Sequence, residues 1–192
     1  WSTATYNTTD WTQWKITSGP INFVDGSTYT VIARSFDNAG NYSVPYATAT
    51  AFVYDSLPPL TAVSTPVNTG YVSSLAAITG TTADQPAVHP GKVNIVELKL
   101  KRLSDNYYWS ITAGVGSWVN SPTILKDDLE VWPSSWNLTV LPAGSNPTTG
   151  LASGTSYYLT TRGSDDAQPA ANVEAFDSPR GSTFTFDNKA PT

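Results

Sequence analysis

Hydrophobic and polar residues alternate along most apolar stretches of this chain, and a period of two residues indicates β-strands. The clearest example is VNIVELKLKR at residues 93–102, where Val96, Leu98 and Leu100 share one face and the other face carries Val93, Ile95, Glu97, Lys99 and Lys101. This pattern predicts a strand with one buried face. The stretch at 61–66 predicts a first edge strand, and clusters of Gly, Pro, Asn and Ser between such stretches predict turns.

Further strand-like stretches follow along the same half of the sequence, at SLAAITG, YYWSI, LEVWPSSWNLTV, TSYYLTTRGSD and GSTFTFD. No segment has a convincing helical period. About seven short strands separated by turn signals predict an antiparallel β-sandwich of the immunoglobulin-like (Ig-like) type. Aromatic residues are 12% of the chain and charged residues only 13%, which also favours strands over helices.

The sequence repeats itself at a long period. The stretch at 26–43 is echoed at 154–174, and 52–59 is echoed at 184–191. Three pairs of matching residues lie 128 positions apart, namely Tyr29 and Tyr157, Arg34 and Arg162, Asp37 and Asp165. Upstream, Trp1 matches Trp118. A repeat of this length has the size of a domain.

The repeat divides the chain unevenly. Residues 1–55 correspond to the C-terminal half of an Ig-like domain, 56–187 to a complete domain, and 188–192 to the start of a linker. The expected fold class is therefore all-β, with tandem Ig-like antiparallel β-sandwiches, one partial and one complete. Either a longer tandem array or another subunit, by strand donation, supplies the missing strands.

Charge and residue types exclude several functions. The chain has 10 basic and 15 acidic residues, a net charge of -5, no cysteine and a single histidine, His89. Nucleic acid and anionic membranes are therefore unexpected partners. Thiolate metal sites, cysteine nucleophiles, His-based zinc sites and Ser-His-Asp triads are excluded, so we expect no enzyme. No apolar run approaches a membrane span of about 20 residues.

The stretches ITGTTAD, GSTYTVIARSFDNAGN and FVYDSLPP together resemble the bacterial Ig-like (Big-type) repeats of large secreted adhesins and surface proteins. Such domains close with a D-x-A-G-N turn and end in a strand that enters an Asp-x-x-x-Pro linker. The resemblance covers nearly the whole chain but fails at 167–172, where AQPAAN replaces AGN. It implies an extracellular or cell-surface location, and calcium in the linkers.

Acidic residues are predicted to meet at one end of the complete domain. In an Ig-like topology the chain entry, the loop after the second strand and the loop before the last strand lie together. This places Asp55, Asp84, Asp165 and Asp166 close to one another, with Asn172 as a candidate carbonyl ligand. Neighbouring carboxylates repel unless a cation neutralises them, and Ca²⁺ binds six to eight such oxygens. We therefore expect an interdomain calcium site; alternatively, these Asp residues only cap turns.

The repeat extends this expectation to both neighbours. Asp37 and Asn41 would face a calcium site shared with a preceding domain, and Asp187 one shared with a following domain. A second class of site is a sugar-binding surface, because exposed indole faces stack on sugar rings. Trp109, Trp118 and Trp132 lie near predicted loops and are the candidates for it.

The sequence thus predicts a non-enzymatic structural or adhesive segment of an extracellular multi-domain surface or filament protein. Its Ig-like repeats would act as a calcium-stiffened spacer or self-associating stalk. Its partners would be neighbouring Ig-like domains of the same chain, or other copies in a filament, with a glycan as a further ligand. The alternative is an Ig-like accessory or carbohydrate-binding module of a secreted carbohydrate-active enzyme.

Overall fold

The computed structural model describes residues 5–6, 14–16, 21–44, 49–126, 129–142, 150–176 and 180–190. Over these residues the protein is all-β and contains no helix, as the alternating pattern predicts. The strands form four sheets, two of which make a large sandwich between residues 60 and 186. The other two are small two-stranded sheets within the first 53 residues.

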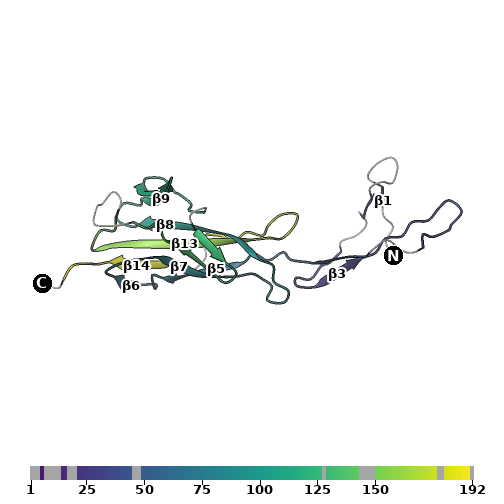
Figure 1. Cartoon of the computed structure of the whole chain (residues 1–192), viewed down its shortest axis with the longest axis horizontal. Coiled ribbons are helices and arrows are strands. Elements are labelled where there is room, and N and C mark those ends of the chain that lie inside the picture. Colours follow the sequence, from purple (N-terminus) through teal and green to yellow (C-terminus); the bar gives the residue numbers. More distant parts are fainter. Residues whose placement is uncertain are drawn as a thin grey trace.

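The larger sheet of the sandwich has six strands. In spatial order they are β10 (Val115–Val119), β9 (Tyr108–Thr112), β8 (Val93–Arg102), β13 (Thr155–Asp165), β14 (Ser182–Phe186) and β6 (Gly70–Val72). All neighbours are antiparallel except β14 and β6, which are parallel. Strands β8 and β13 are the longest and form the centre of the sheet (Figure 1).

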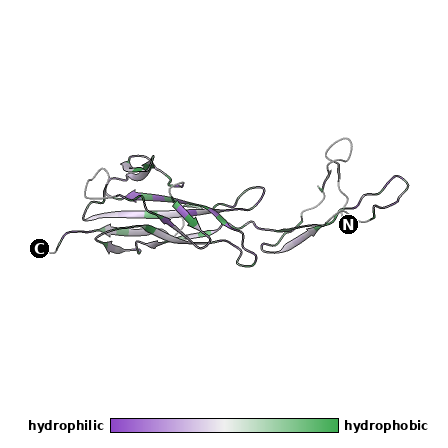
Figure 2. Cartoon of the chain, in the orientation of Figure 1, coloured by the Kyte–Doolittle hydropathy of each residue, from purple (hydrophilic) through white to green (hydrophobic). Residues whose placement is uncertain are grey.

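The second sheet has four strands. Their order is β11 (Leu129–Trp132), β12 (Ser135–Leu138), β7 (Ile78–Ala83) and β5 (Leu60–Thr65). Strand β5 lies at the edge, as the sequence predicts. Apolar residues run along the strands of both sheets (Figure 2). The two sheets share one core, which follows from burying one face of each.

The alternation in β8 decides which residues enter that core. Val96, Leu98 and Leu100 are completely buried, whereas Glu97 and Lys99 between them remain partly exposed. Trp136 and Leu138 bury their side chains from the opposite sheet in the same way. The predicted half-buried strand is therefore confirmed with the predicted face inward.

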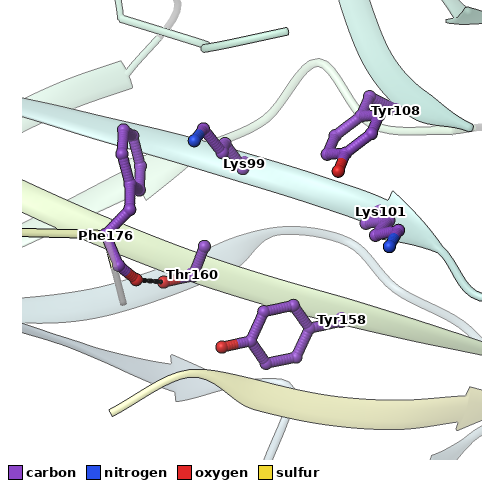
Figure 3. Close-up of a pocket in the computed structure, with 6 residues that line it drawn as sticks. All are labelled: Lys99, Lys101, Tyr108, Tyr158, Thr160 and Phe176. Atoms are coloured by element: carbon purple, nitrogen blue, oxygen red, sulfur yellow. Dashed lines mark hydrogen bonds between the residues drawn. The ribbon is translucent and has the colours of Figure 1, made fainter. Parts of the chain in front are cut away.

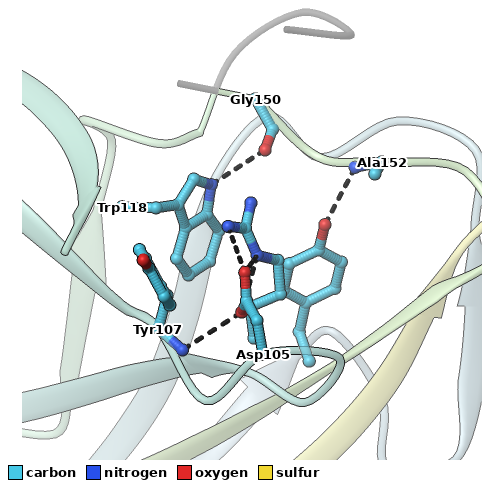
Figure 4. Close-up of polar contacts among 7 residues, drawn as sticks. Asp105, Tyr107, Trp118, Gly150 and Ala152 are labelled. Atoms are coloured by element: carbon cyan, nitrogen blue, oxygen red, sulfur yellow. Dashed lines mark hydrogen bonds and ion pairs between the residues drawn. The ribbon is translucent and has the colours of Figure 1, made fainter. Parts of the chain in front are cut away.

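A row of aromatic rings fills the core beneath β10, β13 and β14. The rings of Trp118 and Tyr157 lie 5.5 Å apart, and those of Tyr157 and Phe184 are stacked at 5.2 Å. The guanidinium of Arg102 lies 4.9 Å from the Trp118 ring and pairs with Asp105 at 2.6 Å. Trp118 and Asp105 are labelled in Figure 4. The charge of this buried arginine is thus compensated by both a carboxylate and an aromatic face.

A buried carboxylate links the two sheets. Glu174 is 5% exposed, and its Oε2 accepts hydrogen bonds from the backbone N–H of Thr61 on β5 (3.1 Å) and of Gly163 on β13 (3.0 Å). The Thr61 hydroxyl donates to the same oxygen at 2.7 Å, and Arg180 forms an ion pair with the other. One side chain therefore satisfies donors from both layers of the sandwich.

The residues before the sandwich form a separate hairpin-like unit. Strand β3 (Thr28–Val31) pairs with β4 (Thr50–Val53) in an antiparallel sheet of its own. Strands β1 (Thr5–Tyr6) and β2 (Trp14–Lys15) form another short pair, and the predicted match at Trp1 lies outside the described residues. We call the described residues between 21 and 55 the first unit and those between 56 and 187 the second unit.

The first unit extends from one end of the sandwich, so that the molecule is elongated and the C-terminal residues lie at the far end (Figure 1). No helix among the described residues is long and apolar enough to cross a membrane.

Candidate metal centre at the junction of the two units

Three carboxylates meet where the first unit enters the second. One oxygen from each of Asp55, Asp84 and Asp165 lies within 4.8 Å of the other two. Asp55 follows β4, Asp84 follows β7, and Asp165 ends β13. These are the chain entry and the two loops that an Ig-like topology is expected to bring together, so three of the four predicted acidic residues are neighbours in space.

Asp84 is the member of this group that lacks compensation. Both of its carboxylate oxygens are buried, and neither has a hydrogen-bond partner among the described residues. The backbone N–H groups of Gln85 and Gly91 lie near this carboxylate and partly lower its pKa, but neither reaches hydrogen-bonding geometry. Burial, reinforced by the negative charges of Asp55 and Asp165, raises the pKa of Asp84 above its ordinary value of 3.8.

Asp55 is in a similar electrostatic position. Burial raises its pKa, and the nearby carboxylates of Asp165, Asp25 and Asp166 add to the shift. The backbone N–H of Leu57 donates to Asp55 Oδ1 at 3.0 Å and partly opposes it. The environment of this site thus disfavours the charged form of both carboxylates. A bound cation would favour the charged form instead.

Asp165 is the carboxylate of this group that hydrogen bonds hold in place. It is 1% exposed, and its Oδ1 accepts the backbone N–H groups of Ala167 (3.1 Å) and Asn172 (2.7 Å). The side-chain amide of Asn172 donates to the other oxygen at 2.8 Å and to the Asp55 carbonyl at 3.4 Å. The Asn172 carbonyl accepts the N–H of Asp165 at 3.2 Å. Asn172 therefore holds the Asp165 carboxylate and contacts the backbone of Asp55 through its side-chain amide, and its role as a carbonyl ligand of calcium stays a prediction.

A glycine allows the fourth carboxylate to approach. Asp166 is exposed and accepts the backbone N–H of Lys92 at 2.8 Å through Oδ1. A Cβ atom added to Gly91 would lie 2.7 Å from that oxygen and 2.8 Å from Asp84 Oδ2. Both contacts are too short for a real Cβ, so the absence of a side chain at Gly91 lets the two carboxylates share one side of the site.

The loop of residues 85–91 also contacts the first unit directly. His89 Nδ1 lies 2.9 Å from the carbonyl oxygen of Gly26 in the first unit. Within the second unit, the Gln85 side-chain amide donates to the Pro58 carbonyl at 3.1 Å. Gly26 has φ +73° and would bring a Cβ within 2.6 Å of the Val88 carbonyl. A glycine is therefore required there both by the turn and by the contact.

The residues predicted to face neighbouring domains lie away from this group. Asp37 is exposed and accepts the side-chain amide of Asn41 at 2.9 Å, which is the main reason why its pKa is lowered. Asp187 is exposed near the C-terminal end, where the N–H of Lys189 and the hydroxyl of Ser153 lower its pKa. Neither is among the carboxylates grouped within this chain over its described residues.

Two of the three tryptophans proposed for sugar binding are not accessible, and their expected exposure was wrong. Trp109 and Trp118 are 1% and 6% exposed, and their indole N–H groups donate to the carbonyls of Val140 and Gly150 (Figure 4 shows the latter). Both alternate with outward-facing residues on β9 and β10, so a position near a loop did not imply exposure. Trp132 is 45% exposed.

A shallow pocket lies instead on the outer face of the six-stranded sheet (Figure 3). It has a volume of about 200 Å³ and is lined by Lys99, Lys101, Tyr108, Tyr158, Thr160 and Phe176. The Lys99 ammonium lies 3.9 Å from the centre of the Phe176 ring, and the Thr160 hydroxyl donates to the Phe176 carbonyl at 2.5 Å. The pocket therefore combines aromatic surface with two cations.

Sequence reasoning missed the contributions of Gly91 and His89 to the junction. No local sequence pattern marks Gly91, because the carboxylates of Asp84 and Asp166 approach it only when the chain folds. A lone histidine predicts neither a zinc site nor a catalytic triad, and its contact with the Gly26 carbonyl leaves no local pattern in the sequence. Asn172 was identified, but its hydrogen-bonding role depends on the turn at residues 165–172, whose sequence departs from the first copy.

No protein-family model matches the chain, and no curated protein matches its sequence. Inference about function therefore rests on the fold and on the geometry of the site.

Proposed function

We propose that this chain is a non-enzymatic segment of an extracellular multi-domain surface or filament protein, in which a Ca²⁺ ion at the junction stiffens successive Ig-like units. The observation that carries the proposal is the group formed by Asp55, Asp84 and Asp165, in which both oxygens of Asp84 are buried without a partner. A buried carboxylate without compensation is costly, and a cation is the group that would compensate it.

The spacing of the oxygens suits Ca²⁺. Oxygens bound to one Ca²⁺ at 2.3–2.6 Å can be at most about 5 Å apart. The three carboxylates fall within 4.8 Å of one another. The side chains of this group offer only oxygen atoms, which favours a hard cation over a soft transition metal. Asp55, Asp84 and Asp165 would hold the ion, and Asp166 is positioned beside them by Lys92 and Gly91.

The consequence for the whole protein would be mechanical. Asp55 is the last residue of the first unit, whereas Asp84 and Asp165 belong to the sandwich. An ion held by all three would restrict bending at the connection, and a series of such junctions would behave as a rod. With Ca²⁺ at ten times its Kd, binding would stabilise the folded state by about 1.4 kcal/mol.

The repeat provides a matched test. Asp55 and Asp187 occupy equivalent positions, but only Asp55 lies beside Asp84 and Asp165. We expect calorimetric titration with CaCl₂ to show binding that Asp55→Asn weakens at least about 10-fold and Asp187→Asn leaves unchanged. Small-angle scattering should show a narrower distribution of end-to-end lengths with Ca²⁺ than with EGTA. Equal binding by both variants, or no binding by the parent, would contradict the proposal.

A second candidate function is glycan binding, and the pocket beside Phe176 is the observation that favours it. Lys99 and Lys101 would attract an acidic sugar while the Tyr108 and Tyr158 rings contact its apolar face. An array that includes uronic-acid and neutral glycans tests it. Binding that is abolished by Lys99→Ala with Lys101→Ala supports this candidate, and an array without signal removes it.

A further inference from the structure

The first unit has the same local structure as the C-terminal part of the second unit. Tyr29 pairs with Phe52 across β3 and β4, and Tyr157 pairs with Phe184 across β13 and β14. Each tyrosine hydroxyl accepts a backbone N–H from five residues earlier, at 2.8 Å in both cases (Val24 and Ala152). A further hydrogen bond recurs at the glycine that precedes each strand. The N–H of Gly26 donates to the Tyr54 backbone carbonyl, and the N–H of Gly154 donates to the Phe186 backbone carbonyl.

The turns that follow the strands also match. Asp37 accepts the backbone N–H of Asn41 at 2.9 Å and its side-chain amide at 2.9 Å. Asp165 accepts the same two groups from Asn172, at 2.7 and 2.8 Å. Equivalent strands, register and turns therefore identify the first unit as the counterpart of β13 and β14, even where its turn sequence differs.

The two units differ in what covers these strands. Tyr157, Leu159 and Phe184 are completely buried. In contrast, Val31, the counterpart of Leu159, is 41% exposed, and Phe52, the counterpart of Phe184, is 38% exposed. The first unit thus has an apolar face without the cover that its counterpart has.

The second unit shows which element provides part of this cover. Strand β8 pairs antiparallel with β13 along its whole length, with Leu100 opposite Leu159 and Leu98 opposite Thr161. Among the described residues, β3 pairs with β4 alone, so its other edge has no strand beside it. Of the two neighbours of β13, the one without a counterpart beside β3 in the described part of the chain is therefore β8.

We propose that the free edge of β3 and the adjoining apolar face are a docking surface for a polypeptide strand of the β8 type. This strand would run antiparallel to β3, with an aliphatic residue such as leucine opposite Val31 and another two positions before it, opposite Ala33. A strand fits because the edge presents backbone N–H and C=O groups that only another backbone can satisfy in series. The alternation of apolar and polar residues would then bury one face and leave the other in water.

This proposal is independent of calcium, because the β3 edge contains none of the carboxylates at the junction. It can be tested in EGTA on the full chain extended by a second copy of its own residues 57–117, placed directly before Trp1. This insertion follows the match of Trp1 to Trp118. We expect backbone amides of Thr28–Val31 to exchange with solvent at least about 100-fold more slowly in the extended chain than in the chain itself.

Two variants keep the result interpretable. In the added copy, asparagine at the positions of Leu98 and Leu100 should abolish the protection while the original sandwich remains folded. Val31→Asp should leave the melting temperature of the unextended chain unchanged, since Val31 is 41% exposed there, and should remove the protection in the extended chain. Exchange in β3 that is equally fast with and without the extension would overturn the proposal.

Discussion

The side-chain amide of Asn172 lies 3.4 Å from the carbonyl oxygen of Asp55, a residue 117 positions earlier in the chain. The same amide donates to Asp165 at 2.8 Å, so one side chain joins the connection between units to the carboxylate group of the sandwich. The geometry of the candidate metal centre therefore depends on a residue that contributes no charge to it.

We expect Asn172→Ala to destabilise the second unit by about 1–3 kcal/mol, because the buried Asp165 carboxylate would lose the hydrogen bond to its Oδ2. Urea unfolding followed by tryptophan fluorescence measures the effect. Asn41→Ala is the matched control, since Asn41 makes the same contacts to an exposed Asp37. An equal loss of stability in both variants would show that burial of Asp165 is not the reason.

Gly91→Ala should weaken Ca²⁺ binding by about 10-fold or more, because the added Cβ would displace the carboxylates of Asp84 and Asp166. Calorimetric titration with CaCl₂ measures this change. The melting temperature in EGTA serves as the control for folding. If the affinity is unchanged while the variant remains folded, these carboxylates do not act together on the ion.

Glu174→Gln should destabilise the sandwich by about 3 kcal/mol, since the buried ion pair with Arg180 would be lost and the hydrogen bonds from β5 and β13 would lose their charge assistance. Glu97→Gln is the control, because Glu97 pairs with Arg162 on a partly exposed face and its loss should cost less than about 1 kcal/mol. Denaturant midpoints at constant m-value provide the comparison. Similar losses of stability in the two variants would contradict the conclusion that burial makes the Glu174 ion pair more important than the Glu97 ion pair.

The raised pKa values of Asp55 and Asp84 predict how stability depends on pH without calcium. Each folded-state pKa lies above the ordinary value of 3.8, so the folded state binds more protons than the unfolded state over that interval. The contribution of these groups to stability is therefore favourable at lower pH and is lost as the pH rises through the raised pKa.

Comparison of Asp84→Asn with the parent isolates this contribution from the lowered pKa values of Asp37 and Asp187, which act in the opposite direction. In EGTA, the asparagine variant should gain stability relative to the parent as the pH rises from about 3.5 to about 7. In saturating Ca²⁺ the parent should be the more stable at neutral pH. If the difference in stability between Asp84→Asn and the parent does not change with pH in EGTA, the pKa of Asp84 is not raised in the folded state.

Several features of the fold followed directly from local sequence. The alternation from Val93 to Arg102 predicted β8 with its bounds and its buried face, because side chains of a strand point alternately to opposite sides. The equivalence of Tyr29 and Tyr157 was visible as a repeat and corresponds to identical hydrogen bonds. In contrast, β6 was not predicted, because three residues are too short to show a period and are held only by parallel pairing with β14.

For the candidate site, the sequence identified the acidic residues, and the order of strands was enough to bring Asp55, Asp84 and Asp165 together. Only the tertiary structure decided that Asp84 is buried without a partner, that Gly91 admits two carboxylates, and that Trp109 and Trp118 are enclosed. The physical reason is the range of the interactions. Alternation, turns and repeats are properties of neighbouring residues, whereas burial and close approach depend on residues that are distant in the chain and meet only when it folds.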